Sequence, residues 1–212
     1  MKKTGIIILG IIIISFLIGI YFYPQMPDNI VSHWNAQGQA DDYMPKFLGL
    51  FLMPAVSLVM FLLFLAIPKI DPLKANIEKF RKYYDWFIVL IILFLFYLYV
   101  LTIFWNLGFR FDLIRFLIPA FGLIFYYAGI LIENAKRNWF IGIKTPWTLT
   151  SEEVWDKTHK IGGMLFKACG ILALLGLLFP AYAMFLVIAP IILTSFYLVF
   201  YSYLEYYHVE SH

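Results

Sequence analysis

Two polar segments hold most of the side chains that could do chemistry. The first, residues 24–46, carries His33 together with the carboxylates of Asp28, Asp41 and Asp42. Imidazole and carboxylate groups ligate metals, and they also hydrogen-bond polar ligands. A single histidine among scattered carboxylates lacks the fixed spacing of a firm metal site, so we expect no metal here. The competing interpretation is a self-capped loop that packs over one end of the molecule.

The local structure of this first segment is predicted from its capping residues. Asp28 is a favourable N-cap for a short helix that runs to about Asn35, and Gly38 suits the turn that would end it.

The second polar segment, residues 133–160, contains a longer pattern. Thr150 and Glu153 have the spacing of a capping box, which predicts a helix that starts there and continues into the apolar run behind it. On that helix Glu152, Asp156 and His159 would share a face. Such a stripe could serve a metal or a proton relay. A solvated helix face with internal ion pairs explains it equally well.

Ahead of this helix, residues Gly142–Trp147 favour an extended conformation. Gly142 permits close backbone approach, Pro146 disfavours the α conformation at Thr145, and Trp147 offers a large packing face. This segment could plug one mouth of the molecule or bind a partner. Gly162-Gly163 further on offers a bend.

The elements that must position these segments are apolar helices. The 212 residues are 63% hydrophobic and only 14% charged, more apolar than a soluble domain tolerates. Runs of about 20 apolar residues cross a bilayer as helices. We predict an all-α, six-transmembrane-helix bundle with short amphipathic surface helices, forming one integral membrane domain over residues 1–212. The predicted spans are 5–23, 47–67, 86–105, 116–132, 161–179 and 181–203, the last two joined by a tight hairpin at Phe179-Pro180-Ala181.

The orientation of the chain follows from its positive charges. With the N-terminus inside, twelve Lys and Arg residues face the cytoplasm and three face outward. The positive-inside rule therefore predicts a multi-pass protein of the cell membrane with both termini cytoplasmic, an outer polar loop at 24–46 and a cytoplasmic loop at 133–160.

The connector between the second and third spans reads as a basic amphipathic helix. It would start at Asp71-Pro72, with apolar residues such as Ile77 and Phe80 on one side and lysines on the other. It would lie on the anionic inner leaflet, or offer a docking face to a cytosolic partner.

One charge is predicted to lie within the membrane. Lys167 falls inside the fifth span, and Glu133 at the end of the fourth is its nearest plausible partner. Snorkelling of the lysine to the headgroups is the alternative. Cys169 is a lone cysteine in an apolar run, so we expect a small buried side chain.

The two polar loops resemble a known family. His33-Trp34-Asn35, with Pro27-Asp28 before and Gly38 and Asp41 after, resembles the N-terminal unknown-function domain that accompanies the SdpI family. The run from Asn138 to Leu149, which includes Phe140, Gly142, Lys144, Thr145, Pro146, Trp147 and Thr148, resembles the SdpI signature, as do Glu153, Trp155, Thr158 and His159 behind it. Lys144 departs from an expected arginine, which keeps the charge and loses the bidentate fork.

The resemblance implies a bacterial immunity protein that binds rather than catalyses. Its partners would be a secreted SdpC-type peptide toxin at the outer loop and a cytosolic transcriptional autorepressor at the inner face, with no cofactor. The alternative is a small multi-pass transporter or exporter, which Lys167 favours. An enzyme is disfavoured because no catalytic motif occurs, and no nucleic-acid-binding motif occurs either.

Overall fold

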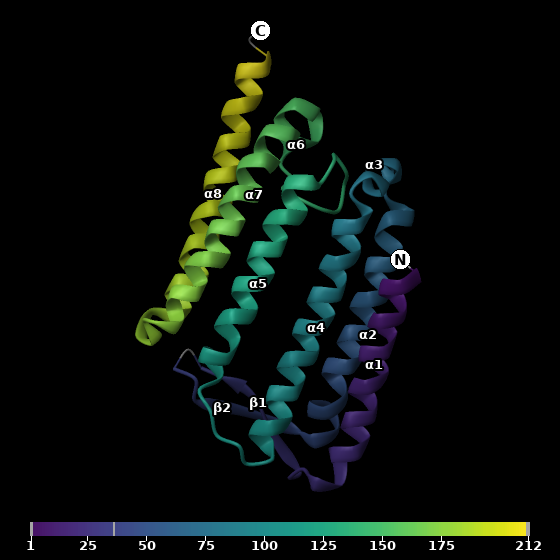
Figure 1. The fold of residues 1–212 in the computed structure, drawn as a ribbon, viewed down its shortest axis with the longest axis vertical. Helices are drawn as coiled ribbons and strands as arrows, with labels where there is room; N and C mark the ends of the chain where they lie inside the picture. Colours follow the sequence, from purple (N-terminus) through teal and green to yellow (C-terminus); the bar gives the residue numbers. More distant parts are fainter. Residues whose placement is uncertain (1, 36, 211–212) are drawn as a thin grey trace. The chain divides into compact units, whose positions relative to one another are not determined.

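The computed structural model of this chain describes residues 2–35 and 37–210. Position 36, in the first polar segment, lies outside the described residues. The elements in chain order are α1 (Lys2–Phe22), the 3₁₀ helix η1 (Tyr23–Gln25), β1 (Asn29–Trp34), β2 (Ala40–Pro45), α2 (Lys46–Ile70), α3 (Lys74–Lys79), α4 (Arg81–Asn106), α5 (Leu113–Asn134), α6 (Pro146–Thr150), α7 (Glu152–Leu174), the 3₁₀ helices η2 (Leu175–Leu177) and η3 (Pro180–Tyr182), and α8 (Ala183–Glu210) (Figure 1).

Six helices within the described residues are long and apolar enough to cross a membrane, as the sequence predicts. Large apolar side chains remain exposed along them, among them Ile6, Phe185 and Phe196 at 71%, 67% and 72%. Exposed apolar surface on this scale has lipid as its natural solvent. The protein is therefore a multi-pass, essentially all-α membrane protein.

The internal packing divides the chain into two compact units. Unit 1 comprises Met1–Phe64 and Ile88–Phe116, and unit 2 comprises Leu65–Phe87 and Leu117–His212. Each is described by itself below.

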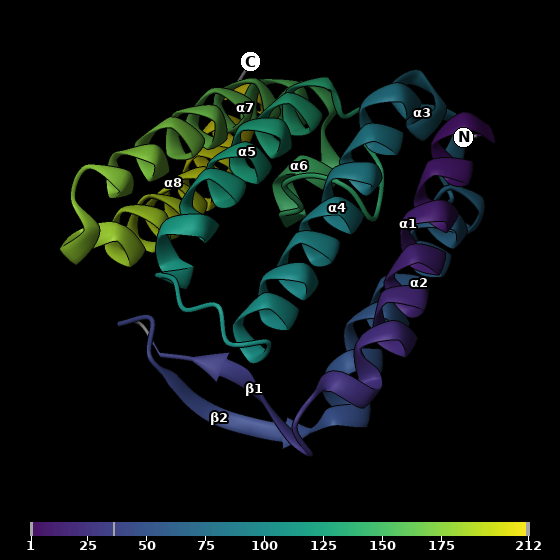
Figure 2. The ribbon, with the colours of Figure 1, turned by 60° about the horizontal axis from the view of Figure 1, so that its bottom comes forward.

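Unit 1 contains the only strands of the described chain, and they correct the predicted outer-loop helix. Asn29–Trp34 is strand β1 and not a helix capped by Asp28; it pairs antiparallel with β2 (Figure 2). The β-branched pair Ile30-Val31 favours a strand, and both side chains are buried. Tertiary burial of this pair overrides the local capping signal.

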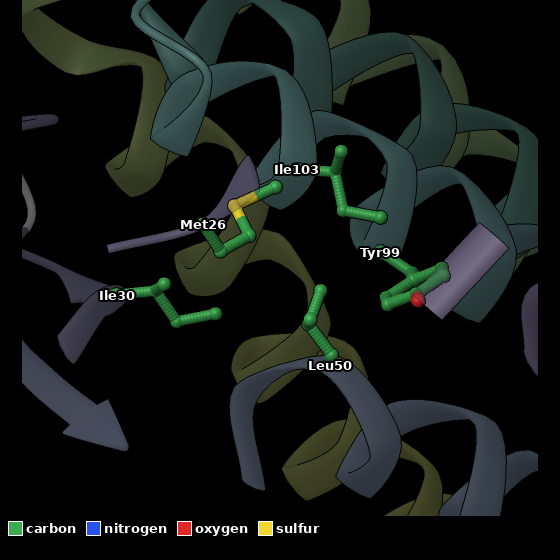
Figure 3. Packing of buried hydrophobic residues seen from close by; sticks show 5 residues of the cluster. All are labelled: Met26, Ile30, Leu50, Tyr99 and Ile103. Atoms are coloured by element: carbon green, nitrogen blue, oxygen red, sulfur yellow. The ribbon is translucent and has the colours of Figure 1, made fainter. Parts of the chain in front are cut away.

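The core of unit 1 lies beneath this hairpin. Met26, Ile30, Leu50, Tyr99 and Ile103 form a buried cluster drawn from the segment after α1, from β1, α2 and α4 (Figure 3). A Cβ added at Gly49 of α2 would clash with the Ile30 side chain, so the absence of a side chain there lets the hairpin sit directly on α2.

Unit 2 is held by close packing of α5 on α7 and of α7 on α8 (Figure 1). A Cβ at Gly163 would lie 2.8 Å from the Gly129 carbonyl oxygen, and one at Gly170 would lie 2.6 Å from that of Gly122. The glycines at both crossings therefore bring the two helix backbones together. The predicted bend at Gly162-Gly163 is wrong, because α7 continues through both residues.

The turn between the last two spans confirms the predicted hairpin. Helix α7 gives way to η2 and η3, and Pro180 begins η3 before α8 starts at Ala183. Cys169 is buried as expected, with its Sγ 3.3 Å from Thr194 Oγ1.

Candidate functional site

The residues of the first polar segment fall into one hairpin of unit 1, and four of its charged side chains form pairs at the surface. His33 Nδ1 lies 2.6 Å from Asp41 Oδ1, and Lys46 Nζ donates to Asp28 Oδ1 over 2.9 Å. Exposed pairs of this kind contribute up to about 1 kcal/mol each. The side chains of His33 and Asp28 remain 65% and 93% exposed. They therefore contribute little to the stability of the fold and are accessible to a ligand.

The tip of the hairpin is organised by Asn35. Its Oδ1 accepts from the backbone N–H groups of Gln37 and Gln39, and its own carbonyl accepts from Gly38 N–H. Gly38 has φ +76°, a conformation that other residues adopt at a cost. Gly38 lies in a turn as predicted, but the turn joins two strands and does not end a helix.

The hairpin is docked by a residue that sequence reasoning missed. Asn106, the last residue of α4, accepts from Val31 N–H over 2.8 Å and donates to the Val31 carbonyl over 3.1 Å. Both backbone groups on the outer edge of β1 are thereby satisfied at this position. Trp34 adds an edge-to-face contact with Trp105, at 5.7 Å between ring centroids. The available signal was an asparagine at the polar end of an apolar helix.

In unit 2 the signature residues form a largely buried polar scaffold. Asn138 has no exposed surface, and its amide makes four hydrogen bonds. The nitrogen donates to the carbonyls of Lys136 and Ile141, and the oxygen accepts from the N–H groups of Phe140 and Ile141. Every hydrogen-bonding position of the side chain is used, so Asn138 fixes the turn that follows α5.

His159 is a second buried anchor. Its Nδ1 lies 2.9 Å from the Trp155 carbonyl, and its Nε2 accepts from Ile143 N–H over 3.0 Å. These two contacts select the neutral tautomer with hydrogen on Nδ1. The ring stacks on Trp155 at 3.8 Å between centroids, and Gly142, with φ +114°, leaves room for it. Trp155 Nε1 in turn donates to the Ala135 carbonyl.

The caps around α6 differ from the predicted ones. Thr145 is the N-cap of α6 and forms a capping box with Thr148, so the extended segment ends at Thr145 and not at Trp147. The cap of α7 is Ser151, whose Oγ accepts from Val154 N–H; the predicted Thr150–Glu153 box is wrong by one residue. The five-residue helix α6, which the sequence pattern did not predict, ends at Thr150 and moves the start of α7 to Glu152.

Helix α6 is also tied to α8. Thr145 Oγ1 lies 3.0 Å from Ser202 Oγ, and both residues are buried. The Trp147 ring meets Tyr203 edge-on at 5.2 Å between centroids. Trp147 is therefore the packing face that the sequence predicts, and it packs within unit 2.

The connector is docked to the signature loop through Asp71. This carboxylate is buried and accepts from Leu73 N–H and Trp139 N–H. Asn76 Nδ2 donates to the Arg137 carbonyl. The predicted start at Asp71 is wrong, since α3 begins at Lys74 and Asp71 instead bridges two segments.

The connector helix is only six residues long. Helix α3 ends at Lys79, and Tyr84 already belongs to α4. Ile77, Phe80 and Tyr84 are buried as the apolar face requires.

The predicted Glu152–Asp156–His159 stripe does not converge. Asp156 pairs with Lys136 at 3.1 Å and Glu152 lies 3.9 Å from Arg137, whereas His159 is 1% exposed. No group of three or more metal-ligating side chains occurs among the described residues. His159 is thus neither part of a three-residue metal site nor part of a solvated helix face. It is buried and accepts an internal hydrogen bond.

The predicted pairing of Lys167 with Glu133 is present. Lys167 Nζ of α7 lies 2.7 Å from Glu133 Oε2 of α5. The two side chains are 25% and 38% exposed, and glycines at 129 and 163 bring their helices together beside them.

The remaining signature residues divide by exposure. Thr158 is buried, and its Oγ1 has no hydrogen-bond partner within the described structure. Phe140, Lys144, Pro146 and Glu153 are exposed. Lys144 Nζ donates to the Phe140 carbonyl, and Glu153 pairs with Lys157, which also reaches Glu205 of α8. The signature is thus mainly a scaffold with a small exposed part.

Two parts of the chain match known protein families. Residues 134–202 match the SdpI/YfhL protein family, and residues 10–58 match a domain of unknown function (DUF1648). About a third of the chain is thus similar to the SdpI/YfhL protein family. It is 28% identical over 195 residues to the Immunity protein SdpI of Bacillus subtilis (strain 168), covering 90% of each chain. No solved structure matches it significantly.

The two matched regions coincide with the two sites. The first covers the hairpin and the adjoining parts of α1 and α2, and the second begins at the end of α5 and covers Asn138, His159 and Ser202. The resemblance drawn from these residues is confirmed. SdpI/YfhL is not a family of known enzymes.

Proposed function

We propose that this protein is an SdpI-like immunity protein that protects the producing cell from a secreted antimicrobial peptide toxin of the SdpC type. The observation that carries the proposal is the similarity to the Immunity protein SdpI over 90% of both chains. Its architecture supports a binding role, since the polar residues singled out by the sequence make scaffolds and surface pairs rather than a catalytic constellation.

The hairpin of unit 1 is the proposed toxin-facing element, through Asp28, His33, Trp34, Asn35, Gly38 and Asp41. Its exposed imidazole and carboxylates can hydrogen-bond a peptide. Docking by Asn106 presents them on a fixed backbone, which lowers the entropy lost on binding.

We propose that both termini are cytoplasmic. The positive-inside bias of the sequence supports this orientation and places the hairpin outside. The test is labelling of single cysteines in a Cys169→Ala background. A membrane-impermeant maleimide should label intact cells at Gln37→Cys and spare Phe140→Cys. The reverse pattern would invert the topology.

A signalling role belongs to the same proposal. The exposed Trp139 and Phe140 lie beside Lys136 and Lys144, a surface able to hold a cytosolic autorepressor at the membrane. The measurement is the localisation of a fluorescently tagged repressor in toxin-treated cells. Recruitment that is lost in Trp139→Ala Phe140→Ala supports the role. A repressor that stays cytosolic opposes it.

The protective role is tested by the survival of sensitive cells challenged with the SdpC-type peptide. Cells expressing the parent protein should survive, and His33→Ala and Trp147→Ala should reduce survival at equal membrane levels. Lys160→Ala, an exposed position outside these contacts, is the matched control. Absence of protection by a correctly inserted parent would refute immunity.

The alternative is a small transporter or exporter, favoured by one observation. The Lys167–Glu133 pair is an ionisable couple within the helix bundle of unit 2. Purified protein in liposomes should then show proton or solute flux that Lys167→Ala abolishes. Flux equal to that of empty liposomes excludes this function.

A further inference from the structure

A pocket of about 280 Å³ lies in unit 1 under the hairpin. Its walls come from β1, β2, α2 and α4, and its surface is mainly apolar. This volume falls below the about 300–1,000 Å³ of pockets that enclose a drug-sized ligand. It therefore suits one part of a larger ligand, such as a single large apolar side chain or a short stretch of acyl chain.

The hairpin is irregular at the point where it lines the pocket. Val31 pairs with Tyr43 and His33 pairs with Asp42, so Ser32 is an extra residue in β1. Bulges of this type redirect a side chain. Here the bulge lets two consecutive residues, Val31 and Ser32, both line the pocket, which a regular strand would not allow. The Ser32 hydroxyl makes no hydrogen bond within the described structure, so it can serve a ligand.

The rest of the lining is adaptable and reaches the lipid-facing surface. Met44 of β2 and Met53 of α2 contribute flexible thioether side chains, which conform to differently shaped apolar groups. Val56 of α2 also lines the pocket and is 38% exposed. An apolar group that approaches along the bilayer can therefore enter from the side of α2.

The charge of the hairpin favours a peptide side chain over a lipid acyl chain as the occupant of the pocket. The hairpin carries Asp28, Asp41 and Asp42 against the single lysine Lys46. Among the described residues Asp42 takes part in no ion pair; one of its oxygens accepts from Tyr43 N–H. Asp42 lies two residues from Met44 on β2 and hence on the same face of the strand. An excess of negative charge on the hairpin attracts a cationic peptide and disfavours the phosphate of a lipid headgroup.

We propose that this pocket is the anchor site for one large apolar side chain of a cationic peptide, with Asp42 as the counter-charge for a neighbouring lysine or arginine of that peptide. The inference rests on the proposed function, in which a toxin supplies the peptide. The inference specifies the class of peptide side chain that is recognised and the pocket that receives it.

The test is binding of fluorescently labelled SdpC-type peptide to the full-length protein in phosphatidylcholine nanodiscs. Val56→Phe fills the pocket from α2 and Thr102→Leu from α4. Each should raise the Kd roughly 10- to 100-fold, the range for losing burial of one large side chain. Val59→Phe is the matched control, because Val59 lies on α2 outside the pocket and is 56% exposed. It should bind like the parent.

The charge is tested in the same assay. Asp42→Asn should weaken binding roughly two- to fivefold at low salt, and Asp42→Glu should restore it. If both filling variants bind the peptide like the parent, the pocket is not the anchor site. The protective function is tested separately, by cell survival. A parent that binds no peptide also overturns the pocket proposal. The proposal is also refuted if a photoactivatable phospholipid labels Met44 equally with and without the peptide. The occupant of the pocket is then an acyl chain.

Discussion

His159 offers a sharp test of the buried scaffold in unit 2. Replacement by phenylalanine keeps an aromatic ring against Trp155 but removes the nitrogen that accepts from Ile143 N–H. A buried donor left without a partner costs about 1–3 kcal/mol. His159→Ala adds a cavity and the loss of the ring contact, so its cost rises to about 3–5 kcal/mol.

Thermal unfolding of the purified protein in nanodiscs measures both variants. At about 2–4 °C per kcal/mol for a chain of this size, His159→Phe should lower the Tm by roughly 2–12 °C, and His159→Ala by more. Lys160→Ala is the control and should leave the Tm unchanged, because Lys160 is exposed on the neighbouring position of α7. A His159→Phe protein as stable as the parent would refute the assigned role of Nε2.

Three further changes probe the contacts that hold each unit. Asn106→Leu should lower the unfolding free energy by about 2–4 kcal/mol, because it unpairs both backbone groups of Val31, and limited proteolysis should then cut the hairpin; an uncut hairpin contradicts this. Gly142→Ala should lower the unfolding free energy by about 1–3 kcal/mol or more, because Gly142 has a φ of +114°. An unchanged Tm would contradict this backbone conformation. A double-mutant cycle of Lys167→Ala and Glu133→Ala should give a coupling of about 0.5–1 kcal/mol; strict additivity means that the pair contributes nothing.

The membrane architecture is readable from the sequence because its cause is local. Runs of apolar residues with the length of a bilayer predict all six helices, and Pro180 predicts the turn between the last two. The Lys167–Glu133 pair is also predictable, since two opposite charges in apolar helices have few other partners.

What escapes the sequence depends on contacts distant along the chain. Asn29–Trp34 looks like a capped helix locally and becomes a strand because Ile30 and Val31 are buried in unit 1. Asp71 looks like an N-cap, yet its second oxygen binds Trp139 N–H 68 positions away. Nothing in the spacing of His159 reveals that it is buried.

Protection of living cells from the peptide is the decisive test of the proposed immunity function. The measurement is the minimal inhibitory concentration of the SdpC-type peptide for sensitive bacteria that carry this protein or an empty vector, at a verified level of inserted protein. We expect a clear rise in that concentration, which His33→Ala should reduce and Lys160→Ala should retain. Equal inhibition of cells with and without the protein would contradict it.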